Sequence, residues 1–347
     1  MSRRIRVLIV DDSAMVRKIL SDSLAAQPDI EVVGTAPDPY VARDKILELA
    51  PDVLTLDIEM PRMDGLTFLK KLMHFHPLPV VIISSLGQAS SRLAVEALAS
   101  GAVEVMAKPS GPFSAEELAQ TLARRIRAAA AVRAPRALPG PSLAAPVTGG
   151  PKPDHPGALS ILAIGASTGG TEAIAQLLRQ MPENGPCVLI VQHIPAGFSS
   201  AFAERLDRTC RMEVREAVDG DAICPGRAIV APGNFHMRVR SAPSGYYVSV
   251  EPGPPVCYQR PSVDVMFESV AESVGKSAIG VILTGMGSDG AEGLLKMRQA
   301  GACTIAQDEE SCVVFGMPRE AIRRGAAGRV MSLEGIAALL SNPQISA

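Results

Sequence analysis

The stretch GASTGG at residues 165–170 decides how the C-terminal half of the chain folds. An apolar run at residues 159–164 precedes it, and a helix-like run at residues 171–178 follows it. This order predicts a strand, a tight glycine turn and a helix. A serine at the apex of such a turn projects its hydroxyl from the end of a sheet, at the positive end of a helix. The stretch therefore fits a nucleophile elbow, and it also loosely resembles a phosphate-binding loop.

The bulk composition bounds the class of protein. A chain of 347 residues suits two domains, and 47% hydrophobic residues suffice for sizeable cores. The formal net charge of −2 argues against nucleic acid as the main partner. No apolar run approaches the roughly 20 residues of a membrane span, so we expect no membrane insertion. The N-terminal apolar run at residues 7–10 is short and is followed by two aspartates, so it does not resemble a signal peptide. We therefore expect a cytoplasmic protein.

Cysteine usage favours the same compartment. All six cysteines lie after residue 180, and no two of them form a Cys-x-x-Cys pair. This pattern predicts reduced thiols rather than a disulfide framework or a zinc site. We expect Cys187 and Cys303 to fill the core.

The first 125 residues or so alternate short apolar strands with amphipathic helical runs. Such alternation predicts an α/β fold with a doubly wound parallel sheet, because continuous apolar strands suit a sheet covered on both faces. The expected strands are 7–10, 32–35, 53–57, 80–84 and 103–106, and the expected helices are 15–26, 41–49, 66–73, 91–99 and 115–130.

The alternation stops in a stretch rich in Pro, Gly and Ala and then resumes, which predicts a second doubly wound α/β domain after a semi-flexible linker. The expected boundaries are 1–127 for the first domain, 128–157 for the linker and 158–347 for the second domain. Residues 238–251 are expected to form a hairpin-like insertion. The expected strands are 160–164, 187–192, 228–231, 247–250, 279–284 and 303–306, and the expected helices are 171–178, 199–209, 263–274, 290–299, 318–324 and 333–340.

Polar side chains follow the strands of the first domain where ligands bind in doubly wound sheets. Asp11 and Asp12 follow the first strand, Asp57 ends the third, Ser84 ends the fourth and Lys108 follows the fifth. Three converging carboxylates stay ionised most easily when a divalent cation shares their site, and oxygen ligands favour Mg²⁺. The set predicts a pocket for moving a phosphoryl group onto the Asp57 carboxylate.

These residues also carry a family resemblance. VLIVDDS at 7–13, DIEMPRMDG at 57–65 and Lys108-Pro109 resemble the receiver domain of two-component response regulators, over about residues 4–125. The resemblance implies a flavodoxin-like fold and phosphorylation of Asp57 by a histidine kinase.

The same resemblance assigns the neighbouring residues. It implies Asp12 and Asp57 as Mg²⁺ ligands with Asp11 close by, a Ser84 hydroxyl that follows the phosphoryl group, and Lys108 paired with that group. Val105 stands where many receivers carry a switch aromatic, so no aromatic-flip mechanism is expected here.

In the second domain, the nucleotide interpretations of the glycine turn fail. A dinucleotide fingerprint needs glycine where Ser167 stands, and a Walker loop needs a following Gly-Lys-Ser/Thr. A nucleophilic serine instead needs a histidine base. His193 follows the next strand, and adjacent parallel strands end within reach of one another. We therefore predict a Ser167–His193 pair.

A carboxylate to orient the histidine is expected in the glycine-rich turn TGMGSDG at 284–290. Asp289 follows an apolar strand and precedes a helix, so it is either the orienting carboxylate or an N-cap, or both. The backbone N–H of Met286 is a candidate for an oxyanion hole, and Thr168 is a supporting candidate. His236 is expected to be structural or to face the substrate. The stretch YQRPSVD at 258–264 is expected to line the cleft or to cap the helix that starts at Val263, and capping alone would explain Asp264.

The order Ser…His…Asp differs from the Ser…Asp…His order of α/β-hydrolases. The motifs IGASTGG at 164–170, VQHIP at 191–195, APGNFHM at 231–237 and LTGMGSDG at 283–290 instead resemble the catalytic domain of chemotaxis protein-glutamate methylesterases of the CheB type. The resemblance covers about residues 158–345.

This second resemblance implies a Rossmann-like esterase domain and its activity. It implies hydrolysis of glutamate methyl esters on methylated chemoreceptors with release of methanol, and deamidation of receptor glutamines, with Ser167, His193 and Asp289 as the triad. It implies no cofactor for the esterase reaction. It further implies that the unphosphorylated receiver restricts access to the esterase and that phosphorylation releases it.

Three other functions remain open at this point. A response regulator with a DNA-binding output would need a basic recognition helix, which the second domain does not offer. A serine hydrolase of another ester or amide would use the same triad. A non-enzymatic, phosphorylation-dependent adaptor would leave the triad without a reaction.

Overall fold

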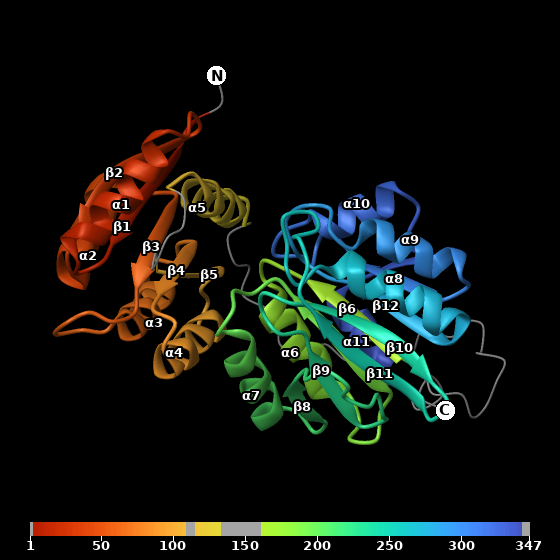
Figure 1. Cartoon of the computed structure of the whole chain (residues 1–347). Helices are drawn as coiled ribbons and strands as arrows, with labels where there is room; N and C mark the ends of the chain where they lie inside the picture. The colour runs from red at the N-terminus through yellow and green to blue at the C-terminus, as the bar shows by residue number, and fades with distance from the viewer. Residues whose placement is uncertain (1–2, 109–114, 133–160, 342–347) are drawn as a thin grey trace. The chain divides into compact units, whose positions relative to one another are not determined.

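The structure is a computed structural model of the whole chain, and it describes residues 3–108, 115–132 and 161–341 (Figure 1). The chain divides into two compact units, Met1–Ala137 and Leu138–Ala347. The division falls inside the expected linker, most of which lies outside the described residues. The described residues at its start belong to the last helix of the first unit, which ends at Ala130.

The first unit is a five-stranded parallel sheet with strand order β2-β1-β3-β4-β5. The order reverses between β1 and β3, so the crevice at their carboxyl ends is the expected ligand position. The expected doubly wound fold is confirmed. The strands are β1 (Ile5–Val10), β2 (Ile30–Ala36), β3 (Val53–Asp57), β4 (Val80–Ser84) and β5 (Glu104–Ala107), and the helices are α1 (Ala14–Ala25), α2 (Pro39–Leu49), α3 (Gly65–Phe75), α4 (Gln88–Ala99) and α5 (Ala115–Ala130).

Local sequence explains where these elements begin. The strands β3 and β4 are buried along their whole length, as the continuous apolar runs predict for a covered parallel sheet. Three helices start at residues whose side chains accept a backbone N–H: Ser13 for α1, Asp38 for α2 and Asp64 for α3. The sheet and its helix caps thereby fix the strand ends that carry the polar residues.

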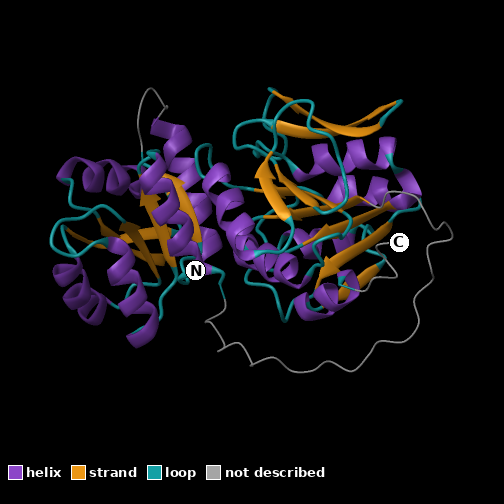
Figure 2. Ribbon diagram, turned by 90° about the horizontal axis from the view of Figure 1, so that it is seen from below, coloured by secondary structure: helices purple, strands orange, loops and turns teal. Residues whose placement is uncertain are grey.

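The second unit is a seven-stranded parallel sheet with strand order β14-β13-β12-β6-β7-β9-β8. Helices cover both faces of this sheet (Figure 2). A separate antiparallel hairpin, β10–β11, packs on α8. The strands are β6 (Ile161–Ala166), β7 (Cys187–Gln192), β8 (Glu213–Glu216), β9 (Arg227–Val230), β10 (His236–Ala242), β11 (Gly245–Glu251), β12 (Ala278–Ile282), β13 (Cys303–Gln307) and β14 (Arg329–Met331), and the helices are α6 (Gly170–Gln180), α7 (Ser199–Thr209), α8 (Val263–Ser273), α9 (Ala291–Gln299), α10 (Met317–Arg323) and α11 (Leu333–Leu340).

In the second unit, two edge strands and one cysteine differ from the sequence-based expectations. The edge strands β8 and β14 were not expected, because four and three residues are too few to show a strand pattern. All six cysteines are free and Cys187 is buried, but Cys303 is exposed, so its expected place in the core is wrong. Cys303 is the first residue of β13, and only the residues after it enter the core. No helix within the described part of the chain has the length and apolar character needed to cross a membrane.

Close packing between β6 and α8 brings the start of that helix to the sheet. A Cβ on Gly165 would lie 2.2 Å from Val263 Cγ1, at the first residue of α8. A Cβ on Gly290, where φ is 90°, would lie 2.6 Å from the same atom. Only glycine at these two positions lets the N-terminus of α8 sit between β6 and the start of α9.

We predict that Gly165→Ala destabilises the C-terminal unit by about 1–3 kcal/mol, because the added methyl group overpacks against Val263. Calorimetry of the full chain should show the unfolding transition of that unit lowered by several degrees. Gly335→Ala is the matched control. Gly335 lies inside α11 and its Cβ would meet its nearest atom at 3.4 Å, so alanine should stabilise slightly. An unchanged transition in Gly165→Ala would contradict the packing argument.

Candidate functional site

Three neighbouring strands of the second sheet bring the expected catalytic residues to one edge. Ser167 follows β6, His193 follows β7, and Asp289 lies in the loop between β12 and α9. The strands β12, β6 and β7 are adjacent and parallel, so these positions share the carboxyl edge of the sheet. Two backbone bonds tie the loops together: Ser167 N–H to Thr284 O at 3.0 Å, and His193 N–H to Ala166 O at 3.1 Å.

Ser167 sits on the expected tight turn. Gly170 N–H donates to Ser167 O at 2.7 Å, and Gly169 adopts the left-handed conformation with φ of 77°. A Cβ on Gly169 would lie 2.6 Å from Val313, so the turn requires glycine there for space as well as for conformation. The side chain of Ser167 forms no hydrogen bond to another described residue. The hydroxyl is therefore free for a reacting group.

The buried imidazole of His193 is engaged on one side only. Its Nε2 lies 2.7 Å from Asp289 Oδ2, whereas its Nδ1 is buried and has no hydrogen-bond partner within the described residues. In the chymotrypsin triad Nδ1 faces the aspartate and Nε2 the serine. In this structure the two nitrogens are exchanged: Nε2 faces Asp289, and Nδ1 is the nitrogen that can accept a proton from another group.

Four donors surround the buried Asp289 carboxylate. Besides His193, they are the Ser262 hydroxyl at 2.7 Å, Val263 N–H at 2.8 Å and Asp264 N–H at 3.1 Å. Burial alone would raise the pKa of Asp289, but the hydrogen bond and charge of His193, followed by the Ser262 and Val263 bonds, outweigh it and lower that pKa. Asp289 is therefore held as a carboxylate.

The two helices beside the triad exchange caps. The N-cap of α9 is Gly290 rather than Asp289, and Asp289 instead accepts the first N–H groups of α8. In return Asp264 accepts Gly293 N–H, in the first turn of α9, at 2.7 Å. The expectation that Asp264 caps its own helix is wrong, because Ser262 occupies that position. The exchange locks the loop that carries Asp289.

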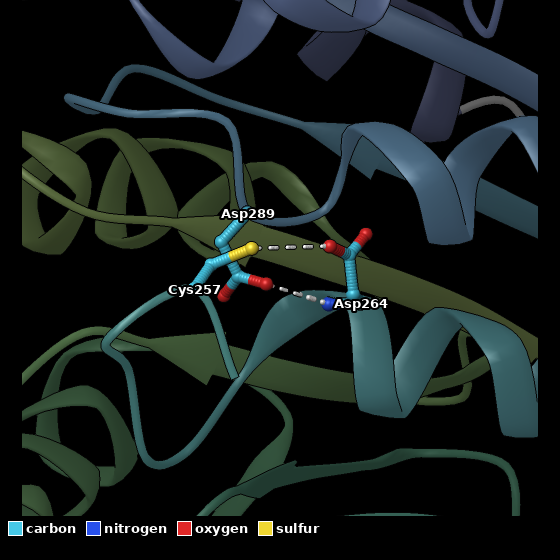
Figure 3. Close-up of side chains that lie close together, drawn as sticks. All are labelled: Cys257, Asp264 and Asp289. Atoms are coloured by element: carbon cyan, nitrogen blue, oxygen red, sulfur yellow. Dashed lines mark hydrogen bonds between the residues drawn. The ribbon is translucent and has the colours of Figure 1, made fainter. Parts of the chain in front are cut away.

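The surroundings of Asp264 form a small polar cluster (Figure 3). Cys257 Sγ lies 3.8 Å from Asp264 Oδ2, and ligand atoms of Cys257, Asp264 and Asp289 lie within 4.8 Å of one another. Burial raises the pKa of Asp264 to about 6, and the Asp289 charge adds to the rise. The lone pairs of Asp289 already face four donors, so Cys257 and Asp264 lie beside a carboxylate that is fully hydrogen-bonded.

The two supporting candidates lie on the loops next to Ser167. The backbone N–H of Met286 has no acceptor within the described part of the chain, so it is free to face a ligand. Thr168 is buried and its carbonyl accepts the Thr284 hydroxyl at 3.0 Å. Met286 therefore has a backbone N–H without an internal acceptor, as the oxyanion-hole prediction requires, whereas the Thr168 carbonyl ties the elbow to the loop after β12.

The sequence did not single out two further residues that shape the site. Gln192 donates from Nε2 to Ser167 O at 2.8 Å, which braces the elbow against β7. Ser262 donates to Asp289, and its own N–H donates to His236 Nδ1 at 3.3 Å. His236 Nε2 lies 3.0 Å from Pro254 O, so both ring nitrogens serve the backbone. The sequence offered only two signals for these residues: Gln192 is next to His193, and Ser262 lies in the stretch 258–264.

The first unit carries the expected acidic pocket. Oxygen atoms of Asp11, Asp12 and Asp57 lie within 4.8 Å of one another. Lys108 Nζ lies 2.7 Å from Asp57 Oδ2 and 3.3 Å from Asp11 Oδ2. Burial raises the pKa of Asp57 to about 6, against the opposing hydrogen bond and charge of Lys108. Apart from its ion pair with Lys108, the buried Asp11 Oδ2 has no donor among the described residues, and the set offers only oxygen ligands, which fits a hard cation such as Mg²⁺.

The β4–α4 loop lies against this pocket. Ser84 is buried and its hydroxyl makes long, 3.5 Å bonds to the Ser85 and Ser90 carbonyls. Glu59, two residues after Asp57, accepts the Ser85 hydroxyl at 3.1 Å and also the Ser90 hydroxyl. Val105, on β5, is buried. The Ser84 hydroxyl is thus weakly held and free to take a better acceptor.

Comparison with known proteins agrees with both units. The family model described as CheB methylesterase matches residues 162–340, and the response regulator receiver domain model matches residues 7–123. The protein-glutamate methylesterase/protein-glutamine glutaminase 2 of Syntrophus aciditrophicus is 52% identical over 340 residues, covering 96% of this chain and 97% of that protein. Its counterpart in Chromohalobacter salexigens is 52% identical over 347 residues, covering 98% and 96%.

Among solved structures, the crystal structure of the Thermotoga maritima CheB methylesterase catalytic domain matches with a TM-score of 0.50 and 38% identity. The match covers 52% of this chain and 97% of that domain. Together with relatives about half identical over nearly the full chain, this match leaves one conclusion: the chain belongs to the CheB methylesterase family and carries a response regulator receiver domain before its esterase domain.

Proposed function

We propose that this protein hydrolyses glutamate methyl esters on chemoreceptors and deamidates receptor glutamines, under control of phosphorylation at Asp57. The full-length relatives are named for the first two activities. The single observation that carries the proposal is the buried His193–Asp289 pair at 2.7 Å, which leaves His193 Nδ1 without a partner among the described residues, on the strand next to the elbow serine.

In the proposed reaction Ser167 is the nucleophile and His193 the general base. His193 Nδ1 takes the hydroxyl proton as Ser167 Oγ attacks the side-chain carbonyl carbon of the methylated glutamate. Collapse of the tetrahedral intermediate expels methoxide, which takes the proton from His193 and leaves as methanol. For a receptor glutamine the leaving group is ammonia. His193 then activates a water molecule that hydrolyses the acyl-enzyme and restores the Ser167 hydroxyl.

Two further groups stabilise charge in this scheme. The free Met286 N–H is the proposed oxyanion donor, with Thr168 in support, and one such donor is worth about 10²–10³ in rate. Asp289 holds the His193 proton on Nε2 and stabilises the imidazolium that forms. Its lowered pKa keeps it ionised at neutral pH. Apart from the methyl ester or amide substrate and the hydrolytic water, the proposed steps use only groups of this chain.

For the first unit we propose that a histidine kinase supplies the phosphoryl group to Asp57. Asp11, Asp12 and Asp57 would hold a Mg²⁺ ion, which when bound neutralises charge on the phosphoryl oxygens. Lys108 contributes a positive charge beside the Asp57 carboxylate at 2.7 Å. The weakly held Ser84 hydroxyl turns to the phosphoryl group, which releases its long bonds to the β4–α4 loop.

We predict that Ser167→Ala lowers methanol release from methylated receptors by at least about 10³-fold, because the covalent intermediate can no longer form. Its thermal unfolding should match that of the natural chain. Ser200→Ala is the control, since Ser200 is an exposed serine on α7 and should release methanol at the normal rate. Substantial methanol release by Ser167→Ala would rule out Ser167 as the nucleophile.

We also predict that Asp57→Asn takes up no phosphoryl group from a small-molecule phosphodonor, as read by the mass of the intact protein. Chelation of Mg²⁺ should have the same effect on the natural chain. Asp44→Asn, at an exposed position on α2, should be phosphorylated normally. Phosphorylation of Asp57→Asn at the normal level would place the acceptor elsewhere.

A further inference from the structure

Ser262 lies at the start of α8, directly beside the Asp289 carboxylate. The side chain is fully buried. Its oxygen accepts the Val265 N–H at 3.4 Å as the helix N-cap, and its hydroxyl donates to Asp289 Oδ1 at 2.7 Å. A hydroxyl has one proton, and an ionised carboxylate only accepts. The proton of Ser262 is therefore committed to Asp289.

The Ser262 hydroxyl fixes the orientation of the carboxylate. Asp289 Oδ2 is shared by His193 Nε2 and Val263 N–H, whereas Oδ1 has the Ser262 hydroxyl at 2.7 Å and the Asp264 N–H at 3.1 Å. The torsion that turns a carboxylate about its Cβ–Cγ bond is soft, so its orientation depends on the donors on both oxygens. Without Ser262, Oδ1 keeps only the longer bond, inside a buried site.

We infer that Ser262 is a positioning residue for the Ser167–His193–Asp289 triad: its hydroxyl holds the Asp289 carboxylate in the orientation that keeps the His193 proton on Nε2 and the Nδ1 lone pair available to Ser167. The inference rests on the proposed function. Ser262 acts through Asp289 and does not touch the substrate. Its contribution is to the chemical step and not to binding.

The backbone around Ser262 holds this donor in place. Ser262 N–H donates to His236 Nδ1 at 3.3 Å, and His236 Nε2 lies 3.0 Å from Pro254 O. Accepting from an amide and donating to a carbonyl fixes His236 as the neutral form with its proton on Nε2. A chain of hydrogen bonds thus runs from the segment after the β10–β11 hairpin through His236, Ser262 and Asp289 to His193.

The test measures kcat and KM for methanol release from methylated receptors with the full chain carrying Ser262→Ala. We expect kcat to fall roughly 10-fold or more, with KM unchanged, because the lost bond goes to a charged group. Ser262→Gly removes the same hydroxyl but costs the helix cap only a few tenths of a kcal/mol, so it keeps the test valid if the alanine variant unfolds. Both variants should lose kcat alike.

The matched control is Ser332→Ala. Ser332 caps α11 by accepting the Gly335 N–H at 3.1 Å, and it touches no carboxylate among the described residues. The Ser332→Ala variant reports the effect of losing a serine N-cap in the same unit, and we expect the kcat of this variant to stay normal. If Ser262→Ala and Ser262→Gly keep kcat within about twofold of Ser332→Ala, the positioning role is refuted.

A second readout needs no turnover. In the Ser167→Ala background, nitrogen NMR of the His193 ring should show the proton on Nε2, and adding Ser262→Ala should give a mixture of the two tautomers. An unchanged tautomer would overturn the inference. This readout separates two failures: absence of methanol release by the natural chain would refute the proposed function, whereas the tautomer still reports whether Ser262 orients the pair.

Discussion

The buried hydrogen bond between His193 and Asp289 is the interaction on which the site depends. Asp289 lies where burial opposes its charge, and the donors Ser262, Val263 and Asp264 join His193 in stabilising the carboxylate. These donors reach the carboxylate because Gly165 and Gly290 leave room for Val263 at the start of α8. The hydrogen bonds to Asp289 thus depend on two glycines that have no side chain to collide with Val263.

Sequence reasoning recovered the elements and residues whose signal is local. The alternation of apolar strands and helices predicted both sheets, and it placed Asp57, Ser167 and His193 at strand ends, where the structure has them. It could not find Ser262, whose contact with Asp289 joins positions 27 residues apart and follows from the packing of two helices. The short strand β14 and the exposure of Cys303 were missed because a few residues at a sheet edge or strand start carry no period.

Both units use the same physical device, polar groups at the carboxyl ends of parallel strands. In the first unit burial raises the pKa of Asp57 to about 6, while the Lys108 ammonium 2.7 Å away opposes that rise. A chemical change at Asp57 therefore alters a buried pocket. Control of the esterase by that pocket needs little energy. A tenfold change in activity corresponds to a difference of about 1.4 kcal/mol between two states.

We propose that phosphorylation of Asp57 in the first unit governs acyl transfer at Ser167 in the second. The most direct measurement is the rate of methanol release from methylated chemoreceptors by the full chain, before and after addition of a small-molecule phosphodonor with Mg²⁺. We expect the rate to rise roughly tenfold or more and to fall again as the phosphodonor is exhausted. If the rate stays unchanged while the mass of the protein shows that Asp57 is phosphorylated, phosphorylation does not control the esterase.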